Sequence, residues 1–195
     1  MEYKIITPEY FKTTGWSGGT TTELFIFPQT ADYQRRNFQF RLSKSVVEVE
    51  KSDFTSLPGI SRKLMVLSGK ITLSHEAHGS RPLNSFEVAE FDGGWKTSSR
   101  GKCTDFNLMT TGKTSGTLRA MVIPESQAVR YEIKRNCDWL FAFLVSGKIN
   151  LSIHDKIIAL EKDDLLVINK PTLKNIEISG ITASELVFSE VSLES

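Results

Sequence analysis

Short runs of apolar residues, many with polar residues at alternate positions, dominate this chain and are separated by Gly, Pro, Asn and Ser. Such runs are typical of β-strands, because alternate side chains of a strand face opposite sides of a sheet. The predicted strands cover residues 23–27, 38–49, 62–67, 70–74, 106–110, 118–123, 140–145, 157–160, 165–168 and 186–191. Helical periodicity is almost absent, so the pattern predicts an all-β protein.

One strand–turn–strand segment occurs twice. Residues 67–74 read Leu-Ser-Gly-Lys-Ile-Thr-Leu-Ser, and residues 145–152 read Val-Ser-Gly-Lys-Ile-Asn-Leu-Ser. A repeat of about 80 residues is too long for a solenoid and suits two compact jelly-roll units. The sequence therefore predicts two tandem cupin (jelly-roll β-barrel) domains packed as a bicupin, residues 1–115 and 116–195. The Thr- and Gly-rich stretch 110–117 reads as the linker, and closed barrels would leave no exposed sheet edges.

Composition excludes several classes of partner. The chain has 195 residues, 39% of them hydrophobic, with 24 Lys and Arg against 23 Asp and Glu. This balance provides no positive field for nucleic acid or an anionic membrane. The chain shows neither a basic start followed by an apolar run nor a span of about 18 apolar residues. Cys103 and Cys137 lack CxxC spacing, which fits a reducing compartment. We expect a cytoplasmic protein without nucleic-acid or membrane partners.

Two short motifs suggest chemistry that their context does not support. Gly15-Trp16-Ser17-Gly18-Gly19 matches the nucleophile elbow GxSxG, but a β-type run follows it where a helix is required. A glycine-rich hairpin or pocket rim is the better interpretation. His75 and His78 suggest a metal site, yet on a continuing strand they would face opposite sides. We therefore predict no metal and no cofactor.

A different set of polar residues can converge on one sheet face. Arg41 and Ser43 alternate with apolar neighbours on one predicted strand, and Asp105 and Asn107 do so on another. Together they offer a guanidinium, a hydroxyl, a carboxylate and an amide, which suit a small ligand with a carboxylate and an amine or amide. A solvated sheet face with an Arg–Asp surface pair is the alternative. Arg62 shares a face with apolar residues and needs either a partner, a ligand or water at a barrel mouth.

Several motifs, in order along nearly the whole chain, resemble the HutD/Ves family. They are Trp16-x-Gly18-Gly19-x-Thr21-Thr22-Glu23-Leu24, Phe40-Arg41-Leu42-Ser43, Asp53-Phe54-Thr55-Ser56-Leu57-Pro58-Gly59-Ile60-Ser61-Arg62, Leu67-x-Gly69, Phe91-Asp92-Gly93, Asp105-Phe106-Asn107-Leu108-Met109-Thr110 and Leu186-Val187-Phe188-Ser189-Glu190. The resemblance implies a bicupin without the metal-binding histidines of catalytic cupins. It also implies a role in histidine utilisation, such as sensing or disposing of formimidoylglutamate or formylglutamate, or in a stress response. No settled enzymatic activity comes with the family.

The residues and the resemblance lead to one hypothesis. The chain is a metal-independent bicupin that binds a small polar or anionic metabolite in its N-terminal barrel, in a regulatory or stress-related role. Arg41 and Arg62 are the carboxylate anchors, and Ser43, Asp105 and Asn107 set orientation, while Glu23 and Trp16 form the rim. The C-terminal barrel is degenerate and serves as a packing partner or forms a homodimer.

Two alternatives stay open. One is a metal-free cupin enzyme, a hydrolase, isomerase or epimerase, with Asp105 or Glu23 as general base. The other is a protein-interaction scaffold, which would expose an apolar patch, and the candidates for it are Phe25, Phe27, Phe141 and Phe143.

Overall fold

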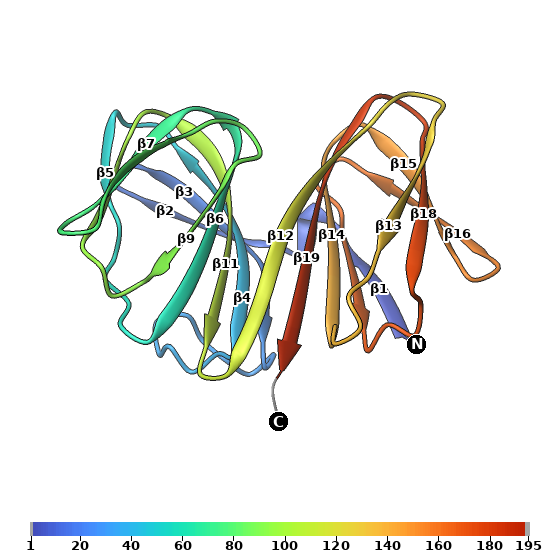
Figure 1. The fold of residues 1–195 in the computed structure, drawn as a ribbon, viewed down its shortest axis with the longest axis horizontal. Helices are drawn as coiled ribbons and strands as arrows, with labels where there is room; N and C mark the ends of the chain where they lie inside the picture. The colour runs from blue at the N-terminus through green and yellow to red at the C-terminus, as the bar shows by residue number, and fades with distance from the viewer. Residues whose placement is uncertain (1, 194–195) are drawn as a thin grey trace. The chain divides into compact units, whose positions relative to one another are not determined.

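The computed structural model describes residues 2–193, and these form nineteen β-strands and one 3-10 helix, Pro8–Tyr10 (Figure 1). The predicted all-β class is confirmed, and each predicted run overlaps an observed strand. Strand β2 (Lys12–Trp16) was not predicted. All of its residues are exposed, so it carries no apolar alternation that a sequence pattern could reveal.

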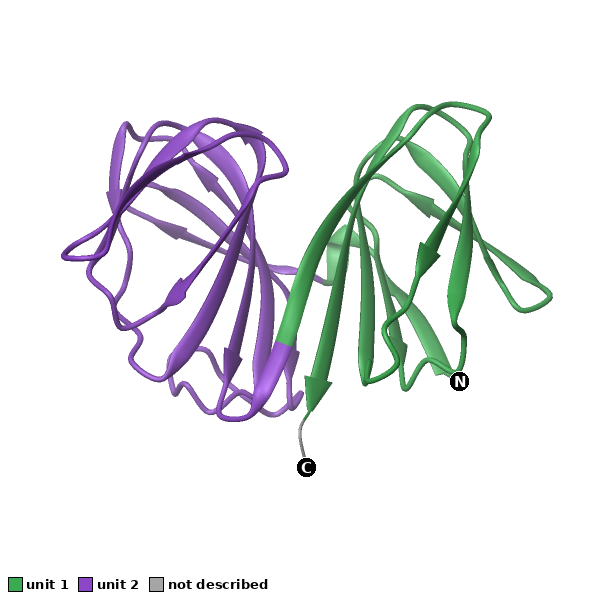
Figure 2. Ribbon diagram, viewed as in Figure 1, with its two compact units in different colours: residues 1–10, 116–195 green, residues 11–115 purple. Residues whose placement is uncertain are grey.

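The chain forms two compact units (Figure 2). One contains residues 11–115, and the other combines residues 116–195 with residues 1–10. From the sequence, residues 1–10 were expected in the N-terminal domain. In the structure they group with the second unit because β1 (Glu2–Ile6) pairs antiparallel with β17 (Leu165–Asn169).

The unit of residues 11–115 consists of a six-stranded and a four-stranded sheet. In spatial order the larger sheet contains β2 (Lys12–Trp16), β3 (Gly19–Phe27), β4 (Phe40–Val47), β11 (Cys103–Thr111), β6 (Ile60–Gly69) and β9 (Val88–Asp92). The smaller sheet contains β5 (Lys51–Asp53), β10 (Thr97–Arg100), β7 (Ile71–His75) and β8 (Gly79–Leu83).

The other unit consists of a five-stranded and a four-stranded sheet. The first contains, in order, β1, β17, β14 (Trp139–Ser146), β19 (Ser184–Leu193) and β12 (Thr114–Ile123). The second contains β13 (Ala128–Glu132), β18 (Asn175–Gly180), β15 (Lys148–Ile153) and β16 (Lys156–Glu161).

The expectation of closed barrels was wrong, because within residues 2–193 each unit has two open sheets. The sheets limit edge pairing in other ways. The edge strand β5 has only three residues, and the edge strand β8 is mostly exposed and carries Pro82, which has no backbone N–H to donate.

The duplicated segment has the same geometry in both units. Gly69 and Gly147 adopt φ values of 85° and 86° where the chain passes from one sheet of the unit to the other, from β6 to β7 and from β14 to β15. Immediately before them, Leu67 and Val145 are the extra residues of β-bulges in β6 and β14. The six-of-eight identity therefore encodes a specific bulged turn in each unit.

The predicted linker at 110–117 contains the boundary between the two units, but most of it is β-strand. Strand β11 continues to Thr111 and β12 begins at Thr114, so a two-residue turn of Gly112 and Lys113 connects them. A stretch rich in Thr and Gly resembles a linker because both residue types also occur at strand ends and in tight turns.

No helix among residues 2–193 is long and apolar enough to cross a bilayer.

Glycine at position 69 is required by both its dihedral angle and its surroundings. A Cβ atom there would lie 2.5 Å from the carbonyl oxygen of Lys102, whereas Gly59, at φ 78°, has nothing within 4 Å of a Cβ position. We expect Gly59→Ala to cost about 1–2 kcal/mol of stability from its dihedral angle alone. Gly69→Ala should cost clearly more, measured by urea unfolding. Equal losses in the two variants would contradict this account of the repeat.

Candidate functional site

Strand register brings the predicted polar residues onto one inner sheet face. Met109 on β11 lies opposite Arg41 on β4 and Arg62 on β6. Two residues earlier on β11, Asn107 lies opposite Ser43. Because alternate residues of a strand share a face, these side chains form adjacent rows, as the alternation predicted.

A β-bulge brings Glu23 to the same face. Glu23 is opposite Ser43, but two residues later Phe25 is opposite Leu42, so the strand gains one residue, Leu24. On a regular strand Glu23 and Phe25 would face the same side. The bulge places Glu23 with the polar rows and Phe25 with the opposite, apolar face.

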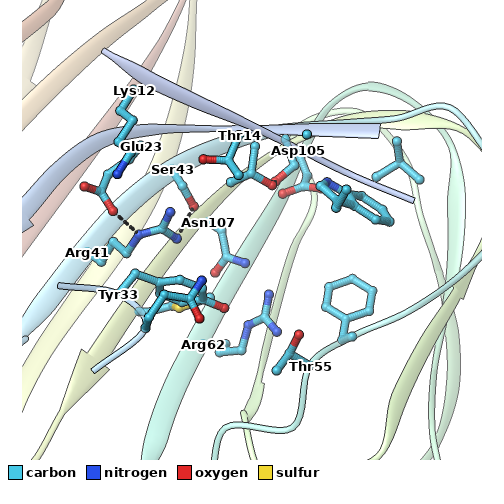
Figure 3. A pocket seen from close by; sticks show the side chains of 18 of the residues that line it. Lys12, Thr14, Glu23, Tyr33, Arg41, Ser43, Thr55, Arg62, Asp105 and Asn107 are labelled. Atoms are coloured by element: carbon cyan, nitrogen blue, oxygen red, sulfur yellow. Dashed lines mark hydrogen bonds and ion pairs between the residues drawn. The ribbon is translucent and has the colours of Figure 1, made fainter. Parts of the chain in front are cut away.

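These residues line a pocket of about 610 Å³ in the unit of residues 11–115. All seven predicted site residues contribute to its wall: Trp16, Glu23, Arg41, Ser43, Arg62, Asp105 and Asn107. Figure 3 shows the side chains of Arg41, Arg62 and Asn107 directed into one space. The structure thus brings the predicted set together, and its role in binding a ligand stays a prediction.

Arg41 is held by neighbouring side chains. Its Nε donates to Glu23 Oε2 at 2.7 Å, and a terminal nitrogen donates to Ser43 Oγ at 3.2 Å (Figure 3). Its guanidinium carbon also lies 4.3 Å from the ring centroid of Tyr33, within cation–π range. The protein itself therefore fixes the position of this cation and neutralises part of its charge.

Arg62 is buried with less compensation. Arg62 is 5% exposed, and its Nε has no hydrogen-bond partner among the described residues. Burial lowers the pKa of Arg62 to about 10, and the charge of Asp105 opposes this effect. The guanidinium is still cationic at neutral pH, so the pocket contains a desolvated donor.

Asp105 is also buried, and it carries an unusual protonation equilibrium. Burial raises its pKa to about 7, although the positive charge of Arg62 lowers it. Close to neutral pH this carboxyl group therefore exists in both forms. The protonated form donates a hydrogen bond and the ionised form only accepts, so the same residue can serve either role.

Asn107 supplies an acceptor beside these groups. It is 4% exposed, and its Oδ1 has no hydrogen-bond partner among residues 2–193. Buried polar atoms are normally paired, because an unpaired one costs about 1–3 kcal/mol. Arg62 Nε and Asn107 Oδ1 are therefore one unpaired donor and one unpaired acceptor within the pocket wall, and both atoms are buried from solvent.

Sequence reasoning missed several residues of the wall, among them Lys12, Tyr33, Phe54 and Thr55. Lys12 lies on the unpredicted strand β2, opposite Glu23. Tyr33 lies in the loop between β3 and β4, where no periodic pattern exists. Phe54 stands in the motif that ends at Arg62, and the clustering of that motif was the available signal.

The histidine pair lies outside this pocket, and the parity argument about it was wrong. Strand β7 ends at His75, and the following turn brings His78 against Trp95 with ring centroids 3.8 Å apart. His75 contacts the same indole at 5.2 Å. No group of three or more His, Cys, Asp or Glu side chains that could hold a metal ion occurs within residues 2–193.

The GxSxG motif has a simple structural role, and Cys103 is a buried free thiol. The GxSxG match forms a hairpin turn between β2 and β3, as predicted, and Ser17 lies at the pocket wall. Burial, with a smaller contribution from the charge of Asp105, raises the pKa of the Cys103 thiol to about 12. A neutral buried thiol is a poor nucleophile.

Among the described residues of the second unit, apolar side chains replace several polar side chains of this face. With the repeated glycines aligned, Leu140 stands where Arg62 stands in the first unit. The strand pairing likewise aligns Leu186 with Asp105 and Phe188 with Asn107. All three belong to a buried apolar cluster. Apolar side chains thus occupy these three positions, whereas buried Glu190 stands where the first unit has Met109.

Solved structures show which class of protein has this arrangement. PA5104, a conserved protein of unknown function from Pseudomonas aeruginosa PAO1, matches with a TM-score of 0.86 and 19% identity over 99% of this chain and 100% of its own. Escherichia coli pirin YhhW in complex with nickel(II) matches with a TM-score of 0.73 and 10% identity over 99% and 100%. The fold is all-β and cupin-like.

The family follows from the sequence. A model of the HutD family matches residues 9–188, and this chain belongs to that family. HutD from Pseudomonas fluorescens SBW25, determined in a formate condition, matches with a TM-score of 0.75 and 19% identity over the whole of both chains. A comparison with curated proteins finds no match.

The protonation of Asp105 predicts a pH-dependent stability difference. Its pKa is about 7 in the folded state against an ordinary 3.8, so the folded state binds more protons between these values. The stability from this residue is complete below pH 3.8 and is lost as the pH rises through 7. Relative to wild type, Asp105→Asn should therefore gain stability on going from pH 4 to pH 8, at up to about 1.4 kcal/mol per pH unit.

Urea unfolding of both proteins across this pH range measures the difference. The comparison at pH 4 is the internal control, because the side chain carries little charge there in either protein. A constant difference between the two proteins at every pH would contradict the buried, proton-binding state of Asp105.

Proposed function

We propose that this chain is a metal-independent bicupin that binds a small anionic metabolite in the pocket of residues 11–115. Arg62 is the principal carboxylate anchor and Arg41 a second one, since Arg41 already has protein partners. Ser43, Asp105 and Asn107 orient the ligand, and Glu23 and Trp16 form the rim. The second unit is a packing or dimerisation partner.

The unpaired Arg62 Nε in the pocket is the observation that carries this proposal. A buried N–H donor without a hydrogen-bond partner costs stability, and a carboxylate that accepts a hydrogen bond from it removes that cost. The unpaired Asn107 Oδ1 adds a requirement for a donor on the same ligand. A carboxylate with a nearby amide, amine or amidine meets both requirements.

Charge and volume support the same ligand class. The pocket wall contains three cationic residues, Lys12, Arg41 and Arg62, against acidic Glu23, Asp32, Asp53 and Asp105. A wall of both signs favours a ligand that carries both an anionic and a donor group over a simple polyanion. A volume of about 610 Å³ lies within the range of small-molecule sites.

Family membership supports a ligand from histidine degradation. Formimidoylglutamate and formylglutamate combine carboxylates with an amidine or amide, as the pocket requires. A cytoplasmic regulatory role in histidine utilisation, or a stress-related role, follows for a protein that binds such an intermediate without turning it over.

A thermal-shift screen of metal-stripped protein tests the proposal. Histidine-pathway intermediates and other small carboxylates are compared, because a ligand that binds only the native state raises the melting temperature. We expect a saturable rise for at least one compound. Arg62→Gln should weaken its binding about 10- to 100-fold, since hydrogen bonds to charged groups contribute about 1.5–3 kcal/mol.

Arg100→Gln is the matched control, because Arg100 is exposed on β10 and outside the pocket. Arg41→Ala should also weaken binding. If no compound shifts the melting temperature while a divalent metal does, the metal-independent proposal is wrong.

An enzyme acting on the same metabolite is the second candidate, and the pKa of Asp105 near 7 favours it. A general acid or base works best when its pKa is near the operating pH. If Asp105 is the base, the rate should rise with pH through about 7, and Asp105→Asn should abolish turnover while the ligand still binds. Proton NMR of ligand incubated with the protein measures this, and an unchanged spectrum would leave binding as the function.

The scaffold alternative gains no support from the predicted residues. Phe25, Phe141 and Phe143 are buried, and Phe27 is half-buried. They therefore supply no exposed apolar patch for a protein partner.

A further inference from the structure

Arg62 lies in a corner formed by two aromatic rings. Its guanidinium carbon is 4.8 Å from the ring centroid of Phe54 and 5.2 Å from that of Phe91. The two rings are nearly perpendicular, at 83°, with their centroids 6.3 Å apart. If Arg62 lay between two parallel rings, their centroids would be farther apart than this. The two rings therefore lie on one side of the guanidinium, and its other side faces the pocket.

The corner is itself supported from behind. The ring of His75 packs on Phe91 with centroids 4.7 Å apart, and its Nδ1 shares a hydrogen bond with Thr97 Oγ1 at 2.9 Å. The backbone N–H of Phe54 donates to the carbonyl oxygen of Thr97 at 2.9 Å. Thr97 therefore links Phe54 to His75, the residue that packs on Phe91. His75 thus has a structural role as a support of the aromatic corner.

An aromatic corner does two things for a buried guanidinium. The negative faces of the rings stabilise a cation that burial has removed from water. The rings also restrict its rotation without using any of its N–H donors, since a cation–π contact is made through the face of the ring. The donors are therefore kept for a ligand in one orientation, and less conformational entropy is lost when the ligand binds.

We propose that Phe54 and Phe91 are positioning residues that hold Arg62 in the orientation in which its N–H groups receive the carboxylate of the ligand. This inference rests on the proposed function for its ligand. The positioning of Arg62 is a property of the unliganded protein and can be measured separately.

A substitution of Phe91 distinguishes the positioning of Arg62 from direct contact with the ligand. Phe54 lines the pocket and can touch a ligand, but Phe91 does not line it and belongs to the apolar cluster beneath. An effect of Phe91→Leu on affinity is therefore transmitted through Arg62. Ile71→Val is the matched control, because Ile71 belongs to the same buried cluster but is not one of the two aromatic rings beside the guanidinium.

The first measurement is the NMR signal of Arg62 Nε–Hε in the unliganded protein, assigned by its loss in Arg62→Gln. Ring-current shielding should shift this proton upfield. The shift should diminish in Phe54→Leu and Phe91→Leu, and persist in Phe54→Tyr and Ile71→Val. An unshifted signal in wild type, or a shift that both leucine variants retain, overturns the positioning role.

The second measurement is the affinity for glutarate, used as a simple carboxylate probe, by calorimetry at a temperature where every variant is folded. Phe91→Leu and Phe54→Leu should weaken binding about 3- to 30-fold, the range of a desolvated cation–π contact. Phe54→Tyr and Ile71→Val should bind like wild type. Unchanged affinity in Phe91→Leu overturns the link between positioning and binding.

The two measurements separate the failure of this inference from that of the proposed function. If wild type shows the shielded Arg62 signal but binds neither glutarate nor any metabolite in the thermal-shift screen, carboxylate binding is wrong and the ligand-directed part of the inference falls with it. If wild type binds glutarate but the signal is unshifted, the proposed function stands and the aromatic corner has no positioning role.

Discussion

Burial of the Arg62 guanidinium is the constraint on which the inner face of the first unit depends. A cation removed from water needs compensation, and here it comes from several directions at modest strength. Phe54 and Phe91 contribute ring faces, and Asp105 contributes charge. None of them occupies the Nε donor. The surroundings thus stabilise the buried cation and still leave its Nε donor without a hydrogen-bond partner.

The same constraint explains the state of Asp105. The positive charge of a nearby arginine lowers the pKa of a carboxyl group, yet burial outweighs the charge of Arg62 and raises the pKa of Asp105 to about 7. The pocket therefore contains Arg62, which is cationic at neutral pH, and Asp105, whose charge changes near neutral pH. Anion binding would favour protonated Asp105, since the neutral acid removes the like-charge repulsion.

The two units show how a duplicated fold can diverge in its interior. Both keep the bulged turn at Gly69 and Gly147, because the positive φ and the close approach of another strand admit no side chain. Only the first has an arginine, a carboxyl group and an amide at these inner positions, where the second has Leu140, Leu186 and Phe188. The bulged turn is common to both units, whereas their buried polar groups differ, and the second unit buries Glu190 as the acceptor of a hydrogen bond from Tyr131.

The sequence by itself determined the all-β class, the duplication and the set of polar side chains on one face, because strand alternation and glycine turns are local properties. Arg41, Ser43, Asp105 and Asn107 could be placed in this way. Only the tertiary structure decided the pairing of β1 with β17, the bulge that turns Glu23 inward, and the contacts of Tyr33, Phe54 and Phe91 with the arginines. These depend on residues distant in the chain, and local periodicity carries no information about such partners. The pKa values of Asp105 and Arg62 likewise depend on burial, which exists only after the sheets have packed.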